Sequence, residues 1–401
     1  MQRALALTLV VCALTITAKA DTYVVLPFFN VSKNNNLDWI GESLSESIHE
    51  ALASQGLVTL DREERVEVYH RLSIRPYALL TRASVVKIAE TLDAEHVIYG
   101  QFDLKPALPD KAAAGQPLTR GSLQITAHML DLKRVREGPE FAEVGSLEDL
   151  AVLQRHLSWQ ALQFVLAKSA PPEADFARQH PAIRVDAIEN YIRGLLAAIP
   201  EEKHRFFTQA ARLDQAFSQP CFQLGKLHFQ KKEYKIAVEW LRKVAPADVH
   251  FREANFFLGL CLYHSGDFAG AQNAFQVVAR SVPLNEVYND IGAAQSRQNI
   301  ADAVESFKKA LEGDPSDPDY QFNVGYALWK RADFDAAAQR FRATLERNPQ
   351  DAEATAMLER CAKRSGPRPG DTKTERLERL KTNYEESAWW QLKAALQPEK
   401  P

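Results

Sequence analysis

The 401-residue sequence predicts two successive parts: an α/β domain with a mixed sheet, followed by an all-α solenoid of stacked helical hairpins. The first observation is a repeat of roughly 34 residues between Ser218 and Asp351. The second is an alternation of strand-like and helix-like segments before residue 168. The third is a proline-rich break, 169–182, between the two parts.

Four consecutive units share one pattern of small and large residues. In the first half of each unit an aliphatic residue precedes a glycine: Leu224-Gly225, Leu258-Gly259, Ile291-Gly292 and Val324-Gly325. In the second half an alanine precedes larger apolar residues at helical spacing: Ala237, Ala271, Ala303 and Ala337. Glycine and alanine let two helices approach closely, so each unit is predicted to be a helical hairpin.

This pattern resembles the tetratricopeptide repeat, which implies a solenoid whose first helices line a concave groove. The solenoid is expected to span 183–363. Its parts are a degenerate repeat at 187–217, regular repeats at 218–251, 252–284, 285–317 and 318–351, and a capping helix at 352–363.

Residues 21–168 are typical of an α/β domain. Runs rich in β-branched and aromatic residues predict strands, and apolar residues four apart, such as Ile40, Leu44 and Ile48, predict helices. The predicted strands are Tyr23–Phe29, Leu57–Leu60, His96–Phe102 and Leu123–Met129, with Phe141–Val144 as a candidate partner of the last. The predicted helices are Leu37–Ala53, Arg62–Leu72, Ala83–Leu92 and Leu147–Leu166.

Two stretches of this domain, VLPFFNVSKNNNLDWIGESLSESIHEALASQGLVTLDREE and AETLDAEHVIYGQFD, give it a resemblance to the TolB amino-terminal-like domain. The resemblance covers 21–168. It implies a periplasmic or regulatory module that precedes tetratricopeptide repeats and catalyses no reaction of its own.

Residues 1–20 are predicted to be a secretory signal peptide. Arg3 supplies the positive charge, Ala4–Thr17 is almost wholly apolar, and Ala18-Lys19-Ala20 fits a cleavage site. The apolar run is shorter than the roughly 18 residues that a membrane anchor needs. We therefore expect cleavage after Ala20, a periplasmic mature chain without a transmembrane segment, and possible envelope association.

Two further segments lie outside the repeats. Because the 169–182 segment is rich in proline, we expect a linker between halves that each have their own core. Residues 374–397 predict one amphipathic helix that carries Trp389 and Trp390. Two docking places remain open for it, the end of the solenoid and its groove, and the end is favoured because the short connection reaches it easily.

Composition and motifs argue against several functions. Without Arg3 and Lys19, 47 basic residues face 52 acidic ones, a net charge of −5 that does not favour nucleic-acid binding. Gly41–Ser45 lacks the last glycine of a nucleophile elbow, and no Cys/His cluster has the spacing of metal ligands. The sequence thus predicts a protein that is not an enzyme and has no catalytic residues, metal or cofactor.

The candidate site is one face of the first helix of each repeat. Its residues stand a few positions before and after the glycine in the sequence. Because its side chains are mostly aromatic, an extended or helical peptide with apolar anchors suits it better than a terminal carboxylate does. Packing in the core between helices remains an equal alternative for these aromatic residues. The predicted groove residues are Phe222, Lys226, Phe229, Phe256, Tyr263, Asn289, Phe322, Tyr326 and Trp329.

Together these features predict an exported, non-enzymatic scaffold of the bacterial cell envelope that binds a partner peptide or protein in the groove. The alternative is a ligand sensor or carrier, in which the α/β domain binds a small molecule and the repeats relay its occupancy. The sequence leaves open the partner's identity, the host's envelope type and the oligomeric state.

Overall fold

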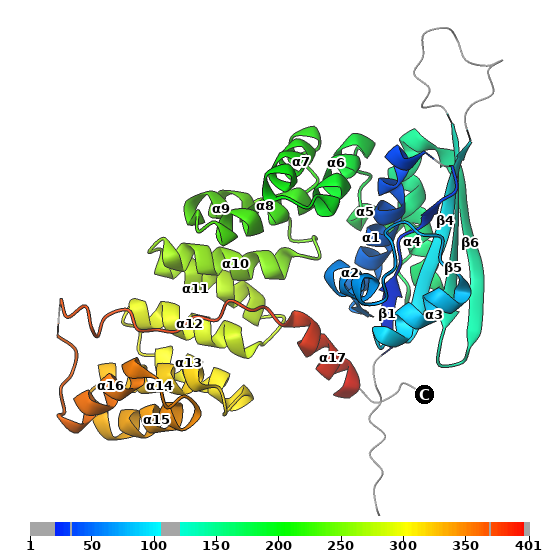
Figure 1. Ribbon diagram of the computed structural model, residues 1–401. Helices are drawn as coiled ribbons and strands as arrows, with labels where there is room; N and C mark the ends of the chain where they lie inside the picture. The colour runs from blue at the N-terminus through cyan, green and yellow to red at the C-terminus, as the bar shows by residue number, and fades with distance from the viewer. Residues whose placement is uncertain (1–20, 33, 106–120, 369, 397–401) are drawn as a thin grey trace, which may run out of the picture.

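The computed structural model describes residues 21–32, 34–105, 121–368 and 370–396, so the predicted signal peptide lies outside the described residues. Figure 1 shows the α/β part on one side and the stacked helices extending away from it. The predicted fold class, an α/β domain with a mixed sheet followed by an all-α solenoid, is confirmed.

The sheet combines parallel and antiparallel pairs in the order β3-β1-β4-β5-β6. β1 pairs in parallel with β3 and β4, whereas β4, β5 and β6 pair antiparallel. The short β2 also pairs in parallel with β4. The strands are β1 (Thr22–Val25), β2 (Phe29–Asn30), β3 (Val58–Thr59), β4 (His96–Lys105), β5 (Ser122–Asp131) and β6 (Arg136–Ser146).

The predicted strand Tyr23–Phe29 is divided in two. Pro27 has no N–H group to donate to a neighbouring strand, and the N–H of Phe28 donates instead to the carbonyl oxygen of Gly41 at 3.1 Å. The strand pairing therefore stops at Val25 and resumes at Phe29.

Helices cover both faces of the sheet. Successive residues of β1 point to opposite faces, so Val25 packs in the cluster with α1 and α4, and Val24 packs with α2 and α3. The helices are α1 (Trp39–Ser54), α2 (Arg62–Arg71), α3 (Arg82–Thr91) and α4 (Leu150–Leu166).

The solenoid consists of helical hairpins that pack tightly at their glycines. A Cβ atom on Gly259 would lie 2.5 Å from the ring of Phe275, and one on Gly194 equally close to Phe207. The degenerate first hairpin therefore uses the same close contact as the regular ones. The helices are α6 (Val185–Leu196), α7 (Pro200–Leu213), α8 (Gln219–Gln230), α9 (Tyr234–Leu241), α10 (Phe251–His264), α11 (Phe268–Ala279), α12 (Asn285–Arg297), α13 (Ala303–Gly313), α14 (Pro318–Lys330), α15 (Phe334–Arg347) and α16 (Ala352–Ala362).

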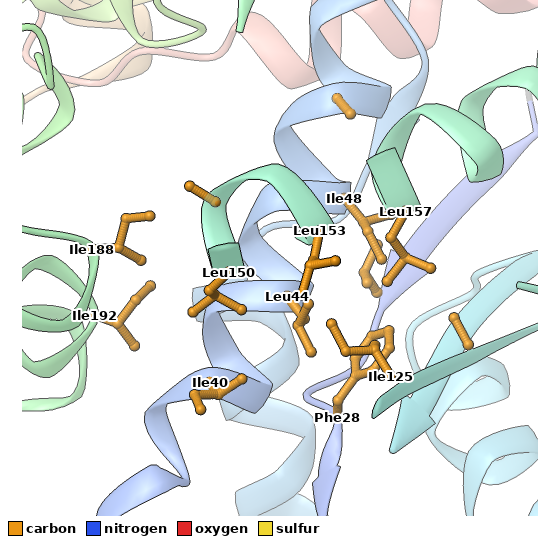
Figure 2. Packing of buried hydrophobic residues seen from close by; sticks show 14 of the residues in the cluster. Phe28, Ile40, Leu44, Ile48, Ile125, Leu150, Leu153, Leu157, Ile188 and Ile192 are labelled. Atoms are coloured by element: carbon orange, nitrogen blue, oxygen red, sulfur yellow. The ribbon is translucent and has the colours of Figure 1, made fainter. Parts of the chain in front are cut away.

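The segment predicted as a linker contributes to an apolar cluster that spans both parts. The expectation that the two halves have separate cores is therefore wrong where they meet, although each half also has clusters of its own. Part of the segment forms α5 (Glu173–Gln179), and Phe176 is 1% exposed. One apolar cluster contains residues of the sheet, α1, α4, α5, α6 and α7. Figure 2 shows Ile40 of α1, Leu150 of α4 and Ile192 of α6 in this shared core.

The predicted C-terminal helix is correct only in its second half. α17 spans Glu386–Leu396, whereas residues 371–385 form neither a regular helix nor a strand. In Figure 1 this segment crosses the repeats before α17. It lies along the face predicted to be the groove, so the favoured end-cap position is also wrong; the contacts responsible are described below.

We expect Phe176→Ala to lower the free energy of unfolding of the whole protein by about 3–5 kcal/mol, because it leaves a cavity where the two parts meet. Urea unfolding followed by circular dichroism measures this loss. Phe164→Ala is the control, because Phe164 is 47% exposed on α4 and should cost much less. Two separate unfolding transitions, only one of them shifted by Phe176→Ala, would contradict a shared core.

Candidate functional site

The predicted groove residues lie on the first helices of four consecutive hairpins. α8 carries three, α10 two, α12 one and α14 three: Phe222, Lys226, Phe229, Phe256, Tyr263, Asn289, Phe322, Tyr326 and Trp329. The chain's own residues 371–385, here called the tail segment, lie across this face. The candidate site is therefore described with its occupant in place.

Asparagine and aspartate side chains bind the main chain of the tail segment. Asn323 donates to the carbonyl oxygen of Arg379 at 2.7 Å and accepts from the N–H of Arg379 at 2.9 Å. Asn289 donates to the same carbonyl oxygen at 2.7 Å, and Asp290 accepts from the N–H of Lys381 at 2.9 Å. Both main-chain groups of one residue are thus paired with the groove.

Further hydrogen bonds continue this main-chain recognition in both directions. On one side Tyr326 donates from its hydroxyl to the carbonyl oxygen of Thr374 at 2.7 Å. On the other side Glu286 accepts from the N–H of Glu385 at 3.0 Å. The recognised stretch therefore extends over the repeats from α14 to α12.

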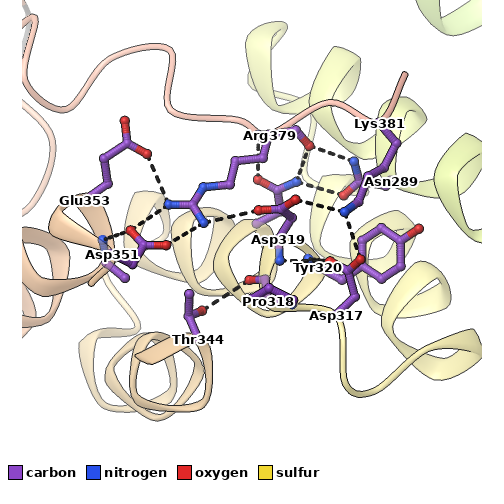
Figure 3. A network of polar contacts seen from close by, with 12 residues as sticks. Asn289, Asp317, Pro318, Asp319, Tyr320, Thr344, Asp351, Glu353, Arg379 and Lys381 are labelled. Carbon is purple, nitrogen blue, oxygen red and sulfur yellow. Dashed lines mark hydrogen bonds and ion pairs between the residues drawn. The ribbon is translucent and has the colours of Figure 1, made fainter. Parts of the chain in front are cut away.

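Two basic side chains of the tail segment enter a cluster of four carboxylates, which we call the acidic cluster: Asp317, Asp319, Asp351 and Glu353 (Figure 3). Arg379 forms two hydrogen bonds with Asp351, at 2.7 and 2.8 Å. Lys381 lies 2.8 Å from oxygens of both Asp317 and Asp319. Arg379 also contacts Asp319 at 3.2 Å, so this carboxylate is shared by the two cations.

Helix geometry explains where the acidic cluster lies. Asp317 is the N-cap of α14 and Asp351 is the N-cap of α16, and each accepts hydrogen bonds from main-chain N–H groups of its helix. Carboxylates are favoured at helix N-termini because the N–H groups there have no partner within the helix. The first helix of the last repeat and the capping helix that follows it thus place their N-cap carboxylates beside the groove.

Aromatic rings complete the contacts. The guanidinium of Arg379 lies 3.7 Å from the ring centre of Phe322, and the ammonium of Lys381 lies 4.9 Å from that of Tyr320. The ring of Tyr384 lies 5.2 Å from that of Phe256. Cations over aromatic faces and tilted ring pairs are both attractive.

Charge pairing and burial shift the pKa values of the groove carboxyls in opposite directions. Burial alone would raise the pKa of Asp351, but hydrogen bonds from Arg379 hold it below its usual value. Burial raises the pKa of Asp290 well above its usual range, and its Oδ2 atom has no hydrogen-bond partner. The hydrogen bonds from Arg379 therefore favour the charged form of Asp351, whereas burial favours the neutral form of Asp290.

The predicted groove residues play different parts. Asn289, Phe322, Tyr326 and Phe256 contact the tail segment, and Phe256 also lies 5.9 Å from the core ring of Phe275. The groove and core interpretations therefore both hold for Phe256.

The remaining predicted residues lie towards the ends of this face. Trp329 donates to the carbonyl oxygen of Ser365, before the tail segment begins. Phe222 and Lys226 line a pocket together with Tyr384. Phe229 packs against Tyr234 and Phe257, and Tyr263 against Phe268, within the repeats.

Sequence reasoning missed the polar residues that hold the occupant: Glu286, Asp290, Asp317, Asp319, Asn323, Asp351 and Glu353. A signal existed for two of them, because Asp290 and Asn323 both stand two residues before the glycine of their repeat. The acidic cluster had no such signal, because each of its carboxylates was also a plausible helix cap or first-turn residue.

A second candidate site is a cavity of about 220 Å³ between the α/β part and the repeats. It is lined on one side by Ser43, Glu46 and Glu50 of α1, and on the other by Tyr191 and Asp248. Burial raises the pKa of Glu46 to about 7 and that of Glu50 to about 8. The cavity therefore holds two carboxyl groups that retain their protons into the neutral range.

Within the described part of the chain, no three His, Cys, Asp or Glu residues are placed to hold a metal ion. No described helix is both long and apolar enough to cross a bilayer. The thiols of Cys221, Cys261 and Cys361 are free and buried, and burial raises the pKa of each.

Several solved structures are similar to part of this chain. Solved structures with similarity include YrrB, described as "a TPR protein with an unusual peptide-binding site" (18% identity, TM-score 0.41, 50% of this chain and 99% of that one). Others are MamA from Desulfovibrio magneticus RS-1 (24%, 0.37, 40% and 92%) and PilF from Pseudomonas aeruginosa (20%, 0.36, 41% and 76%). No curated protein matches the chain.

A family model for the tetratricopeptide repeat matches residues 222–286 and 293–352. These ranges contain α9, α10, α11, α13, α14 and α15 whole, and parts of α8 and α12. The repeated hairpins of this chain are therefore tetratricopeptide repeats.

Proposed function

We propose that this protein is an exported, non-enzymatic scaffold of the bacterial cell envelope that binds an extended segment of a partner protein in the groove of its repeats. One observation carries the proposal: Asn323 pairs with both the N–H and the carbonyl oxygen of Arg379. This pairing recognises a main chain, which any polypeptide offers. A helical peptide would use the same groups within its own helix, so the groove favours an extended segment.

The tail segment occupies the place that the partner would take. Because it is tethered to the repeats, its local concentration is of the order of millimolar. A partner must therefore compete with it, and the groove binds strongly only when the tail segment is displaced. The proposed scaffold thus has a closed state, seen here, and an open state with a free groove.

Export and an envelope role rest on the first twenty residues and on the α/β half. The signal-like pattern supports export, and the resemblance of 21–168 to the TolB amino-terminal-like domain supports a periplasmic location. In this proposal the α/β half docks to the envelope or to a second partner, while the repeats bind the extended segment.

The cavity between the two parts favours a second candidate function, a ligand sensor or carrier. It is lined by residues of α1 in the α/β half and of α6 in the repeats, so a bound ligand would contact both parts. A small molecule that binds there should raise the melting temperature without any protein partner. Loss of that stabilisation in Glu50→Gln would place the ligand in this cavity.

The groove can be tested in a full-length chain whose tail segment is repelled by the acidic cluster, Arg379→Glu with Lys381→Glu. We expect this open chain to bind a labelled peptide of residues 374–388 in fluorescence anisotropy. Adding Asn289→Ala and Asn323→Ala should weaken binding at least ten-fold, since each removes buried hydrogen bonds. Asn255→Ala is the control, because Asn255 donates within its own helix. Equal binding by all three chains would contradict main-chain recognition in the groove.

Processing is tested on protein exported from bacterial cells that express the full chain. We expect mass spectrometry of the intact mature protein to give an N-terminus at Asp21. Cys12 lies within the apolar run Ala4–Thr17. A mature N-terminus at Cys12 carrying lipid would instead show a lipoprotein, and an uncleaved chain would contradict the signal peptide.

The cavity carboxyls predict a pH dependence. A carboxyl whose pKa is raised by folding stabilises the protein most below its unfolded value, here 4.5, and that stabilisation is lost as the pH rises through the folded value. We therefore expect the melting temperature to fall between pH 6.5 and 8, and Glu50→Gln to reduce this fall. His250 faces Glu50; burial lowers the pKa of His250, but its hydrogen bond with Asp248 and the neighbouring carboxylates outweigh burial and raise the pKa, so His250 also contributes to the pH dependence and part of it remains in Glu50→Gln. Glu148→Gln serves as the control, because Glu148 is exposed in the short 3-10 helix Leu147–Asp149. An unchanged profile in Glu50→Gln would refute the assignment.

A further inference from the structure

The groove reads side-chain charge as well as the main chain. Its acidic cluster contains four carboxylates, and they face two basic side chains of the tail segment. When the tail segment leaves, the four carboxylates lose the ion pairs that they form with Arg379 and Lys381. An occupant without positive charge would leave carboxylates that repel one another beside a partly buried surface.

The spacing of the two cations is set by the extended main chain. Residues two apart in an extended segment project to the same side, roughly 7 Å from one another. Arg379 and Lys381 are two apart, and both reach Asp319, which lies between their other partners. Leu380, between them, packs against the apolar clusters of the repeats. An order of cation, apolar residue, cation therefore matches the groove.

The position of this triplet along the groove is fixed by main-chain hydrogen bonds of the two basic residues themselves. The N–H and carbonyl oxygen of Arg379 pair with Asn323, and the N–H of Lys381 pairs with Asp290. A segment that shifted by one residue could keep its main-chain bonds only by turning its cations away from the acidic cluster. Only one register of the segment therefore satisfies both the main-chain hydrogen bonds and the ion pairs.

The two cationic positions differ in chemistry. The first is matched to arginine, because each oxygen of Asp351 accepts one hydrogen bond from the guanidinium and the ring centre of Phe322 lies 3.7 Å from it. The second suits lysine, because its compact ammonium lies between Asp317 and Asp319. Three residues further on, Tyr384 places its ring against Phe256.

We propose that the partner segment carries the pattern Arg, apolar residue, Lys and, three residues later, an aromatic ring, and that residues 379–384 of the tail segment are an internal mimic of it. This inference rests on the proposed function and specifies its ligand. The partner is accordingly a protein with a basic, extended segment, and the closed state is the chain bound to its own copy of that pattern.

The test uses the open full-length chain, Arg379→Glu with Lys381→Glu, and labelled 374–388 peptides. The key comparison is a peptide with Leu380→Lys and Lys381→Leu, which keeps the composition and net charge but places the cations side by side. We expect it to bind at least ten-fold more weakly than the native peptide. A peptide with Arg379→Gln and Lys381→Gln should also bind at least ten-fold more weakly, and the native peptide should lose affinity as salt rises.

Charge reversal supplies the reciprocal test. In a full-length chain with Asp319→Lys and Glu353→Lys, neither of which is an N-cap, the native tail segment should be released. That chain should bind a 374–388 peptide with Arg379→Glu and Lys381→Glu better than the native peptide. Hydrogen exchange of residues 374–385 reports release, and circular dichroism checks that the repeats remain folded.

The outcomes separate this inference from the function on which it rests. If the reordered and neutral peptides bind the open chain as tightly as the native peptide, the groove binds extended segments without reading charge, and the pattern is wrong. If no peptide binds, the proposed function fails as well. Concentration-dependent dimers of the native chain that disappear on Arg379→Glu with Lys381→Glu would show tail exchange between copies and overturn a separate partner.

Discussion

The solenoid depends on one contact that recurs in its hairpins: an apolar side chain of the second helix lies against the backbone of a glycine in the first. A Cβ on Gly292 would lie 2.7 Å from Phe307, and one on Gly225 2.5 Å from Leu241. Because this contact uses only part of the circumference of the first helix, residues beside it, such as Asn323 two positions before Gly325, remain to line the groove. The groove is thus a consequence of how each hairpin closes.

The polar residues of that face explain why the tail segment is extended. Asn289, Asp290 and Asn323 are fully buried, and a buried polar group without a partner costs about 1–3 kcal/mol. An extended main chain offers the N–H and carbonyl groups that these side chains need, whereas a helix would have used them internally. α17 begins at Glu386, directly after Glu385 makes the last of the groove bonds. The helix therefore begins only after the last main-chain N–H group that is bound by the groove.

The sequence predicted the repeats and the mixed sheet well because both leave local, periodic patterns. It failed at the tail segment, where Leu377, Leu380 and Tyr384 have helical spacing but the competing hydrogen-bond partners lie on α12 and α14. It failed at the linker because Phe176 is a single aromatic residue in a proline-rich stretch and creates no period. The polar residues that bind the tail segment could be identified only from the structure, in which the tail segment occupies the groove.

The closed state also connects the groove to the α/β half. α17 follows the tail segment and lies against β3, while Glu386 at its start pairs with Arg252 of α10 at 2.5 Å. The shared core fixes the α/β half against the first repeats, so β3 and the groove keep their relative positions. Displacing the tail segment alone leaves α17 as a tether that favours rebinding. A partner that contacts both the groove and the surface beside β3 would remove tail segment and tether together, and would therefore open the scaffold with less competition than a peptide alone.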